Sequence, residues 1–530
     1  MTRQFRVMPW VAFSIALLLS FAYLFIGLGL INDQFYWLFL CKNYRSSPMS
    51  VGTLWLGHIW GSLFSYSLIS FRILKWIIEL LSLFFACRIA KFNRNGFTVY
   101  LSALALLLIG YGWQNEYSPT VLTNLCIVLI VYAFSLYMTK WSTASLIIMA
   151  LFTGVSAVVR FPNIMAVPIM ALSIIVYGIG KGEKIICIIK HVVLFLGTSL
   201  AVWWFATAAL LMTPTPISSL RASISSVAQG AHSFESLLNG YLWDFSSFWG
   251  LMTTSFFFGM TMVVYRGGTS GKWKVFVCIC SVILFGLFFL KTVGFHKWVN
   301  MQLLQFLSAS ILMLLIVGIY LSVLNKNVSR GVLYLCVLML SFVPTMGSDT
   351  RYMKLFPLTL YFLPFLWQSV VGIRKDDRYL LPTCAELVFC AMLCFWGNPN
   401  ASSEKSIPLW TCTEKDSSSS LAPVRISKGE MEWVQAISKA VDTYEGPKVS
   451  YGFASFFLNY VSRGKISLAS SNFGDQIMNE NDYFEQQFPH LQDNKFIFIC
   501  TMKPSLFEQK LVDEGYIMRE KNALFKVYSL

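Results

Sequence analysis

The residues best suited to chemistry stand in short polar segments that follow long apolar runs. Asp33 lies one turn beyond the first run, Glu116 lies in the segment 114–118, and Arg351 and Tyr352 come just before a late run. Two carboxylates at one depth could share a divalent cation such as Mg²⁺ or Mn²⁺, or one could act as a general base. An arginine at that depth could bind a phosphate group through two hydrogen bonds. Taken singly, each could also be an ordinary interfacial side chain.

The composition indicates a polytopic membrane protein. The chain has 530 residues, of which 56% are hydrophobic and 13% are charged, and its mean hydropathy is +0.61. Soluble proteins usually carry about 25% charged residues. The net charge of +15 is typical of basic loops at a membrane surface, so we expect no nucleic-acid partner. The first apolar run follows Arg3 and Arg6 and is too long for a signal peptide, so we expect a retained helix.

About 13 apolar runs are long enough to be membrane-spanning helices. They lie at 9–31, 70–88, 97–113, 119–139, 142–159, 163–179, 188–212, 248–265, 274–291, 301–324, 331–346, 355–373 and 379–397.

Basic residues fall in alternate loops between these runs. If the N-terminus is cytoplasmic, every inner loop carries Lys or Arg, as the positive-inside rule requires. The inner-loop residues are Arg88, Lys91, Arg94, Lys140, Lys181, Lys184, Lys190, Arg266, Lys272, Lys274, Lys326, Arg330, Arg374, Lys375 and Arg378. The outer segments are then 32–69, 114–118, 160–162, 213–247, 292–300, 347–354 and the tail from 398. This places Asp33, Glu116, Arg160 and Arg351 on one side, outside the cytoplasm.

The C-terminal part has a soluble pattern. The transmembrane domain covers 1–397, a linker covers 398–427, and a small α/β domain on the outer side covers 428–530. Helical periodicity at 430–444 and helical stretches at 454–462 and 504–514 separate strand-like runs, which favours a largely parallel sheet. These runs lie at 449–453, 465–469, 495–500 and 523–528. Cys412 and Cys500 both fall in this tail and could form a disulfide outside the cytoplasm.

Two outer segments carry further polar residues. The segment 213–247 is long enough to be a lid, and its Arg221 and His232 could contact an acceptor. The segment 49–69 is amphipathic and is expected to lie in the membrane interface, where His58 could pack or contact an acceptor. Lys75 and Glu79 are four residues apart in the second span, which favours an internal ion pair over a proton relay.

The order of these motifs resembles the integral-membrane glycosyltransferases of the GT-C superfamily, which includes protein mannosyltransferases and lipid A aminoarabinose transferases. The resemblance covers about residues 1–373, and many relatives have two adjacent acids where Asp33 stands alone here. The matching pieces are Asn32-Asp33-Gln34-Phe35-Tyr36, Ser47-Pro48-Met49, Ser70-Phe71-Arg72, Asn115-Glu116, Arg160-Phe161-Pro162 and Arg351-Tyr352-Met353-Lys354-Leu355-Phe356-Pro357.

The resemblance implies transfer of a sugar from a polyprenyl-phosphate-linked donor to a glycan, lipid or protein acceptor, with inversion, on the periplasmic or extracytoplasmic face of a bacterial inner membrane. Asp33 would be the general base, and Glu116 would support it or hold a divalent cation with it. Arg160 and Arg351 would neutralise the donor phosphate, which Tyr352 would position. Two alternatives stay open: an outer-face polysaccharide polymerase or ligase that depends on Arg221 and His232, and a non-enzymatic lipid or solute transporter.

Overall fold

The structure is a computed structural model of the whole chain. It describes residues 4–28, 31–89, 96–112, 116–221, 239, 311–312, 315–316, 318–346, 351–370, 411–415, 421–452, 454–468, 496–501, 506–522 and 524–530. The predicted spans at 248–265, 274–291 and 379–397 lie outside these residues, as does His232 in the predicted lid.

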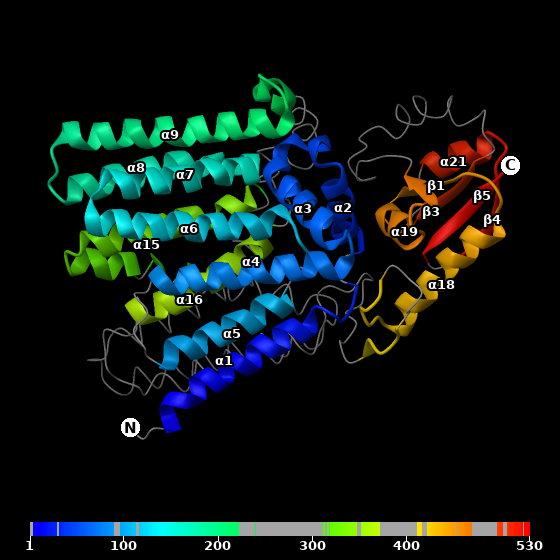
Figure 1. Cartoon of the computed structure of the whole chain (residues 1–530), viewed down its shortest axis with the longest axis horizontal. Coiled ribbons are helices and arrows are strands. Elements are labelled where there is room, and N and C mark those ends of the chain that lie inside the picture. The colour runs from blue at the N-terminus through cyan, green and yellow to red at the C-terminus, as the bar shows by residue number, and fades with distance from the viewer. Residues whose placement is uncertain are drawn as a thin grey trace.

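Long apolar helices lie side by side in the N-terminal part of the chain (Figure 1). They are α1 Gln4–Tyr23, α4 Leu68–Ile89, α5 Gly96–Gly112, α6 Pro119–Lys140, α7 Thr143–Val159, α8 Ala166–Gly180, α9 Ile185–Leu211, α15 Val328–Ser341 and α16 Arg351–Val370. Among the described residues, four stretches are long and apolar enough to cross a membrane: Pro119–Lys140, Phe161–Gly180, Ile185–Leu211 and Val328–Thr345. The predicted spans in these four regions are therefore confirmed as apolar helices, whereas the total of 13 is not tested.

Local sequence signals set several of these boundaries. Ser118 and Pro119 open α6, and Trp141 ends it in the left-handed conformation with φ 46°. Ser142 then caps α7, because its hydroxyl accepts a hydrogen bond from the Ser145 backbone N–H. Helix α1 ends at Tyr23, well before the predicted end of the first span at residue 31, and an irregular turn follows it.

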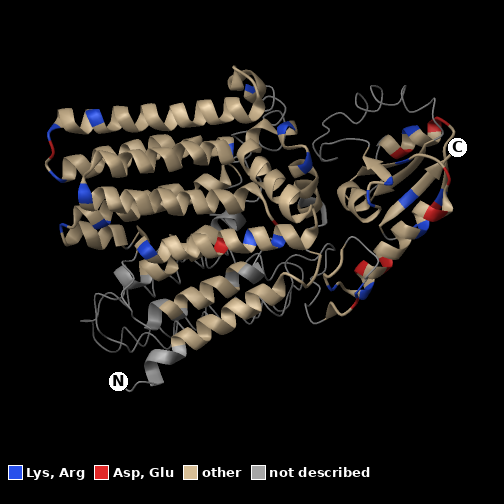
Figure 2. Cartoon of the chain, in the orientation of Figure 1, with Lys and Arg blue, Asp and Glu red and all other residues tan. Residues whose placement is uncertain are grey.

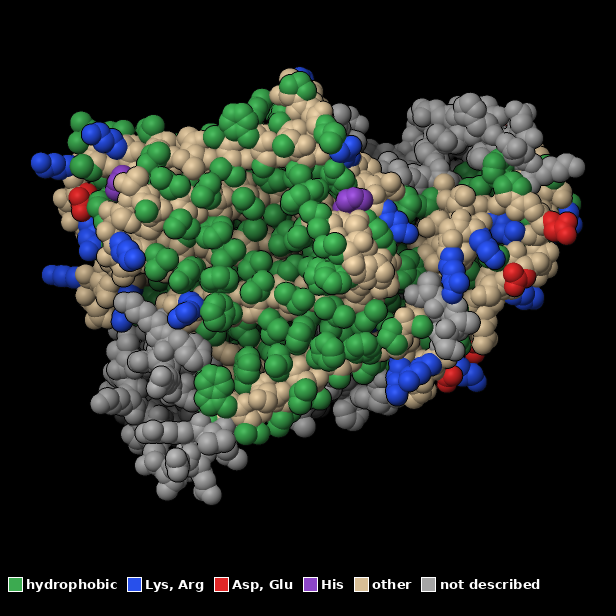
Figure 3. Space-filling model, in the orientation of Figure 1, with side chains coloured by type: hydrophobic (Ala, Val, Ile, Leu, Met, Phe, Trp, Pro, Cys, Tyr) green, Lys and Arg blue, Asp and Glu red, His purple; other side chains and the backbone are tan. Residues whose placement is uncertain are grey.

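The helix bundle is apolar on its flank and charged at its ends. Hydrophobic side chains cover the flank seen in Figure 3, as expected for a surface that faces lipid. In Figure 2, Lys and Arg gather at the end of the bundle remote from the C-terminal domain, where α4 ends with Arg88 and α6 ends with Lys140. The predicted alternation of loops thus holds for the described helices. That this basic end is cytoplasmic remains an inference from the positive-inside rule.

The predicted first outer loop, 32–69, is largely helical. It contains α2 Ile31–Lys42, the 3₁₀ turns η1 Tyr44–Ser46 and η2 Pro48–Ser50, and α3 Val51–Phe64. One face of α3 is buried by protein, because Val51, Thr53 and Leu54 are inaccessible, whereas Trp55 is exposed. A Cβ at Gly52 would lie 2.7 Å from the Val158 carbonyl oxygen, so glycine is what lets α3 approach α7. The expected interfacial segment is therefore also a packing element of the bundle.

The C-terminal domain is a mixed five-stranded sheet with helices. It consists of α18 Lys428–Thr443, β1 Lys448–Gly452, α19 Ser455–Val461, β2 Ile466–Leu468, β3 Ile497–Thr501, α21 Leu506–Asp513, β4 Ile517–Lys521 and β5 Phe525–Ser529. The strand order is β2-β1-β3-β5-β4. Strands β2 and β3 pair with β1 in parallel, but β5 is antiparallel to both β3 and β4. The prediction of a largely parallel sheet is right for one half and wrong for the other.

The two tail cysteines do not form a disulfide. Cys412 and Cys500 are both free and buried, so the disulfide that the sequence left possible is not formed in the structure. Burial raises the pKa of the Cys412 thiol to about 12 and that of Cys500 well above its ordinary value. Both thiols are therefore protonated at neutral pH and behave as small apolar side chains.

Candidate active site

Segments that are far apart in sequence meet at the end of the bundle nearest the C-terminal domain (Figure 1). Thr53, in the first turn of α3, joins two of them. Its backbone carbonyl accepts a hydrogen bond of 2.7 Å from the Tyr117 hydroxyl, and its own hydroxyl donates one of 2.9 Å to the Val159 carbonyl. Tyr117 and Val159 each stand next to a predicted site residue, Glu116 and Arg160 respectively. A single buried threonine therefore fixes the Glu116 turn relative to the end of α7.

Arg160 extends this arrangement to the predicted Arg351 segment. It caps α7 in an extended conformation with φ −155°. Its Nη1 donates to the Pro344 carbonyl at 3.0 Å and its Nη2 to the Met346 carbonyl at 2.5 Å. Both carbonyls belong to the turn η4 Val343–Thr345 or to the residue after it. Arg160 is only 8% exposed, so it positions the chain leading into α16. Its predicted contact with phosphate stays a prediction.

Glu116 is buried rather than interfacial. It lies in the bend between α5 and α6, and only 3% of its surface is exposed. It is placed just before the N-terminus of α6, where the partial positive charge of the helix stabilises an anion. The role of Glu116 as a supporting acid or a cation ligand stays a prediction.

Asp33 lies in a helix and not in a loop. It is the third residue of α2, although its side chain is outside the described part of the structure. The next residue, Gln34, is buried, and its amide Nε2 donates to the Leu28 carbonyl at 2.8 Å. The first turn of α2 is therefore fixed in rotation beside Asp33.

Arg351 and Tyr352 begin helix α16 rather than preceding it. Their side chains also lie outside the described part. The backbone places them at the same end of the bundle as Glu116 and Arg160, because α16 follows the η4 turn that Arg160 holds. The backbone thus brings these segments to one end of the bundle, and the roles of Arg351 and Tyr352 stay predictions.

Arg72 is a residue that site prediction from the sequence missed. It is 1% exposed, and its guanidinium donates to the Leu24 carbonyl at 2.8 Å, the Gly27 carbonyl at 2.7 Å and Gln34 Oε1 at 3.1 Å. Arg72 therefore holds the turn between α1 and α2 in place. The signal in the sequence was a single arginine near the start of an apolar span. Burying an arginine there is costly unless its N–H groups are hydrogen-bonded.

The other predicted contacts are dispersed. His58 Nδ1 lies 3.1 Å from the Cys41 carbonyl and 2.8 Å from the Tyr66 hydroxyl, so this ring packs within the α2–α3 region. It is five residues from Thr53 on α3, and the two side chains diverge by about 140°. Arg221 is exposed and lies ten residues beyond Leu211, the last residue of α9.

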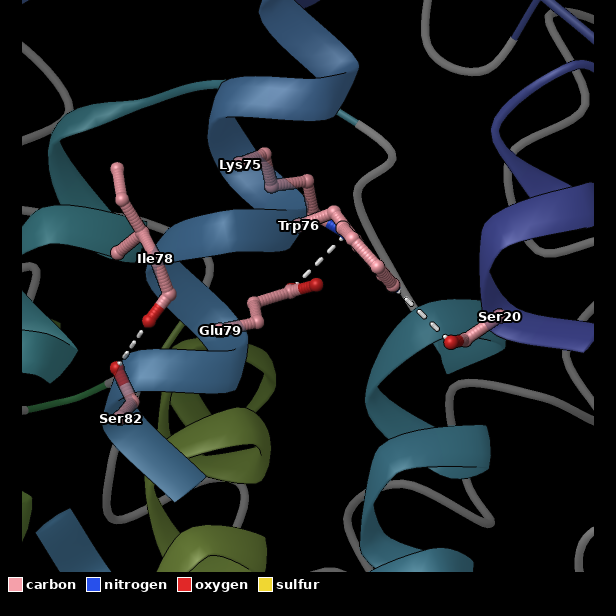
Figure 4. Close-up of polar contacts among 6 residues, drawn as sticks. All are labelled: Ser20, Lys75, Trp76, Ile78, Glu79 and Ser82. Atoms are coloured by element: carbon pink, nitrogen blue, oxygen red, sulfur yellow. Dashed lines mark hydrogen bonds and ion pairs between the residues drawn. The ribbon is translucent and has the colours of Figure 1, made fainter. Parts of the chain in front are cut away.

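Lys75 and Glu79 form the predicted internal ion pair (Figure 4). Lys75 Nζ lies 3.0 Å from Glu79 Oε1, and the side chains are 2% and 5% exposed. One turn of α4 also contacts α1, because Trp76 Nε1 donates to the Ser20 hydroxyl at 3.0 Å. Both residues belong to α4, and Lys75 lies one turn beyond Arg72 on that helix.

No cluster of metal ligands was found in the described part of the chain, where groups of three or more His, Cys, Asp or Glu were sought. Because the Asp33 side chain is not described, the pairing of Asp33 with Glu116 around a cation is not tested.

No protein-family model matches the chain, and no curated protein matches it. Solved structures do match it. The chain is similar in fold to GT-C glycosyltransferases. The oligosaccharyltransferase AglB of Archaeoglobus fulgidus, in complex with an inhibitory peptide and a dolichol-phosphate, is 11% identical over 94% of this chain and 70% of that chain, with a TM-score of 0.48. A structure of the A. fulgidus oligosaccharyltransferase with Zn and sulfate is 14% identical over 92% and 68%, with a TM-score of 0.49.

ArnT of Cupriavidus metallidurans bound to undecaprenyl phosphate is 10% identical over 99% of this chain and 98% of that chain, with a TM-score of 0.45. These proteins are of the superfamily that the sequence motifs resemble. At such identities and TM-scores the similarity assigns no role to any residue here, so residue roles depend on the contacts within this chain.

Proposed function

We propose that this chain is a membrane glycosyltransferase that moves a sugar from a polyprenyl-phosphate carrier to an acceptor at the end of the bundle nearest the C-terminal domain. The observation that carries the proposal is the chain of contacts from Tyr117 through Thr53 to Val159, and from Arg160 to the η4 turn. These contacts gather the segments of Glu116, Arg160 and Arg351, whose side chains have the chemistry that such a transfer needs.

The reaction requires a base at the acceptor and positive charge at the donor. Asp33 takes the proton of an acceptor hydroxyl while that oxygen attacks the anomeric carbon of the sugar. The bond between this carbon and the phosphate oxygen breaks, and the leaving phosphate gains negative charge. Arg351, with Tyr352 beside it, meets that charge from the start of α16, and Arg160 holds the preceding segment and adds positive charge. Base assistance accounts for about 10²–10⁴-fold of such a rate, and fixed charges at the leaving group contribute further.

The proposed donor fits the surroundings of this site. The bundle flank is apolar (Figure 3), as a surface that accommodates a polyprenyl chain within a bilayer must be. AglB and ArnT were solved with dolichol-phosphate and undecaprenyl phosphate, and we propose the same class of carrier here, in a bacterial inner membrane with the C-terminal domain outside. A divalent cation, if bound, would be held by Asp33 and Glu116 and would supply positive charge, but no step above depends on it.

The test replaces the proposed base, Asp33, with asparagine, which has the same shape but cannot take up the proton. Purified protein in nanodiscs is incubated with a panel of radiolabelled undecaprenyl-phosphate monosaccharides and envelope acceptors, and release of undecaprenyl phosphate is measured. We expect Asp33→Asn to lower kcat by about 10²-fold or more, with an unchanged melting midpoint and unchanged binding of undecaprenyl phosphate. Asp442→Asn is the matched control, because Asp442 is exposed on α18, and it should remain active.

Two other outcomes would replace the proposal. Full transfer by Asp33→Asn, with losses at Arg221 and His232, would favour the polymerase or ligase reading of the sequence. Movement of the labelled lipid across the membrane without any cleavage, in both wild type and Asp33→Asn, would favour a transporter.

A further inference from the structure

The α1–α2 turn and helix α2 are held from two sides, by the bundle and by the C-terminal domain. We propose that the C-terminal domain is a positioning element for the site: by docking on α2 and on the turn before it, the domain fixes the helix that carries Asp33. This inference rests on the proposed function for its catalytic consequence, but the docking itself can be measured without any activity.

The first contact is an aromatic one between α19 and α2. The Phe35 ring lies 5.2 Å from the Phe457 ring and 4.8 Å from the Tyr460 ring. Phe456 in turn contacts Tyr36 at 5.0 Å. Phe35 and Phe457 are fully buried by this packing. Aromatic pairs at such distances stabilise a contact beyond the area that they bury, so α19 holds α2 by its buried face.

The second contact is polar and lies at the turn before α2. The Gly27 backbone N–H donates to the Arg425 carbonyl, and the Arg425 N–H donates to the Phe25 carbonyl, each at 2.7 Å. Residue 425 belongs to the predicted linker, which at this point pairs with the bundle like a short parallel strand. The linker therefore does not act only as a flexible tether.

The capping box of α18 extends this polar contact. Glu430 accepts a hydrogen bond of 2.8 Å from the Ser427 backbone N–H, and the Leu28 backbone N–H also hydrogen-bonds its carboxyl group. Glu430, the third residue of α18, therefore also contacts the turn between α1 and α2. Docking of the domain and formation of this helix end are coupled.

Arg72 joins the two contacts from the side of the bundle. It binds the carbonyls of Leu24 and Gly27 and the side chain of Gln34, and Gln34 is adjacent to Asp33. The Leu68 backbone N–H, one turn before Arg72 on α4, donates to the Tyr460 hydroxyl of α19 at 2.9 Å. The bundle and the C-terminal domain thus hold the same turn and the same helix. A displacement of about 1 Å at a reacting group can cost about 10²-fold in rate, so loosening α2 should act on kcat.

The experiment compares two buried phenylalanines of the same domain in the full-length protein. Phe457→Leu loosens the contact with α2. Phe498→Leu is the matched control, because Phe498 is equally buried but packs on Phe507 and Tyr516 within the domain. Hydrogen–deuterium exchange of peptides from 31–42 measures the order of α2, and kcat and KM are measured with the undecaprenyl-phosphate sugars. Tyr460→Phe, which removes only the hydroxyl that accepts from Leu68, is used if Phe457→Leu does not fold.

We expect Phe457→Leu to speed exchange in 31–42 by about tenfold or more and to lower kcat by about 10²-fold at similar KM. Phe498→Leu should leave exchange in 31–42 unchanged. Equal exchange in both variants would overturn the positioning role. Faster exchange with an unchanged kcat, while Asp33→Asn is inactive, would overturn its link to catalysis. If Asp33→Asn is active, the proposed function fails, and the exchange comparison alone decides whether the domain orders α2.

Discussion

The Lys75–Glu79 pair gives the sharpest quantitative prediction. It is an ion pair at 3.0 Å inside an apolar bundle, where a lone charge has no water to solvate it. At an effective dielectric constant of about 20, two unit charges at this distance attract by about 5 kcal/mol. Much of this attraction only offsets the cost of burying the two groups. The pair as a whole should therefore add little to stability, although either half alone should cost a great deal.

Three variants separate the attraction between Lys75 and Glu79 from the cost of burying their charges. Lys75→Met and Glu79→Met each leave one buried charge without its partner, and each should lower stability by about 3–5 kcal/mol. The double variant removes both charges and replaces them with apolar chains of similar length, so it should lie within about 1 kcal/mol of the wild type. In thermal melts of the protein in nanodiscs, each single variant should lose on the order of 10 °C and the double variant should recover most of it.

Activity is measured on the same samples. A structural pair predicts normal transfer in the double variant, since α4 is intact and neither side chain is proposed to touch the substrate. Additive losses of melting temperature in the double variant would refute the energetic reasoning. A double variant with restored melting but no transfer would refute the structural assignment and indicate a proton relay.

Three further predictions concern Gly52 on α3, Arg160 after α7 and Glu430 on α18. Gly52→Ala should lower both activity and the melting midpoint, because its methyl group would lie 2.7 Å from a carbonyl oxygen of α7. The control is Gly197→Ala on α9, where an added methyl group meets no atom within 4 Å. This variant should be neutral or stabilising by up to about 1 kcal/mol in the same melts. Arg160→Lys should lower kcat in the transfer assay, because an ammonium group cannot reproduce the two-carbonyl contact of a guanidinium; unchanged kcat would show that the η4 contact is dispensable. Burial raises the pKa of Glu430 above its ordinary value of 4.5, so the folded protein binds this proton more tightly than the unfolded chain does. The resulting stabilisation of the fold is complete below about pH 4.5 and is lost as pH rises through the folded-state pKa. Melts of wild type and Glu430→Gln should therefore coincide at low pH, and the wild type should fall below the variant as pH rises; parallel curves would contradict this.

The helices were predictable because a bilayer leaves few alternatives. Backbone groups in lipid must be paired within the segment, so a long apolar run becomes a helix, and α6 and α9 follow their predicted runs closely. The end of α1 was not predictable by the same argument. Residues 24–28 are as apolar as the helix before them, and the chain turns there because Arg72 and the backbone of Arg425 supply partners from distant segments.

The predictions of the sheet and of the site were incomplete for a related reason: the residues that mattered carry no clear signal in the sequence. Strand β4, Ile517–Lys521, was missed because it carries Arg519, Glu520 and Lys521 at an exposed edge and shows no apolar alternation. The sequence predicted that Glu116 and Arg160 share one end of the bundle, and the structure places them there. It did not predict their burial, because the residue that joins their segments, Thr53, has no distinctive signal in the sequence.

The motif pieces contain three arginines, Arg72, Arg160 and Arg351. The hydrogen bonds of the first two show that they hold the backbone. Arg72 and Arg160 together donate to four main-chain carbonyls, those of Leu24, Gly27, Pro344 and Met346. Each carbonyl belongs to a turn that precedes a proposed catalytic helix, α2 or α16. Irregular backbone near a membrane persists only where such groups are satisfied, so these two arginines primarily shape the site. In the mechanism proposed above, the charge that meets the leaving phosphate would then come mainly from Arg351. The proposed site therefore combines one arginine assigned to the substrate, Arg351, with two that hold the backbone around it, Arg72 and Arg160.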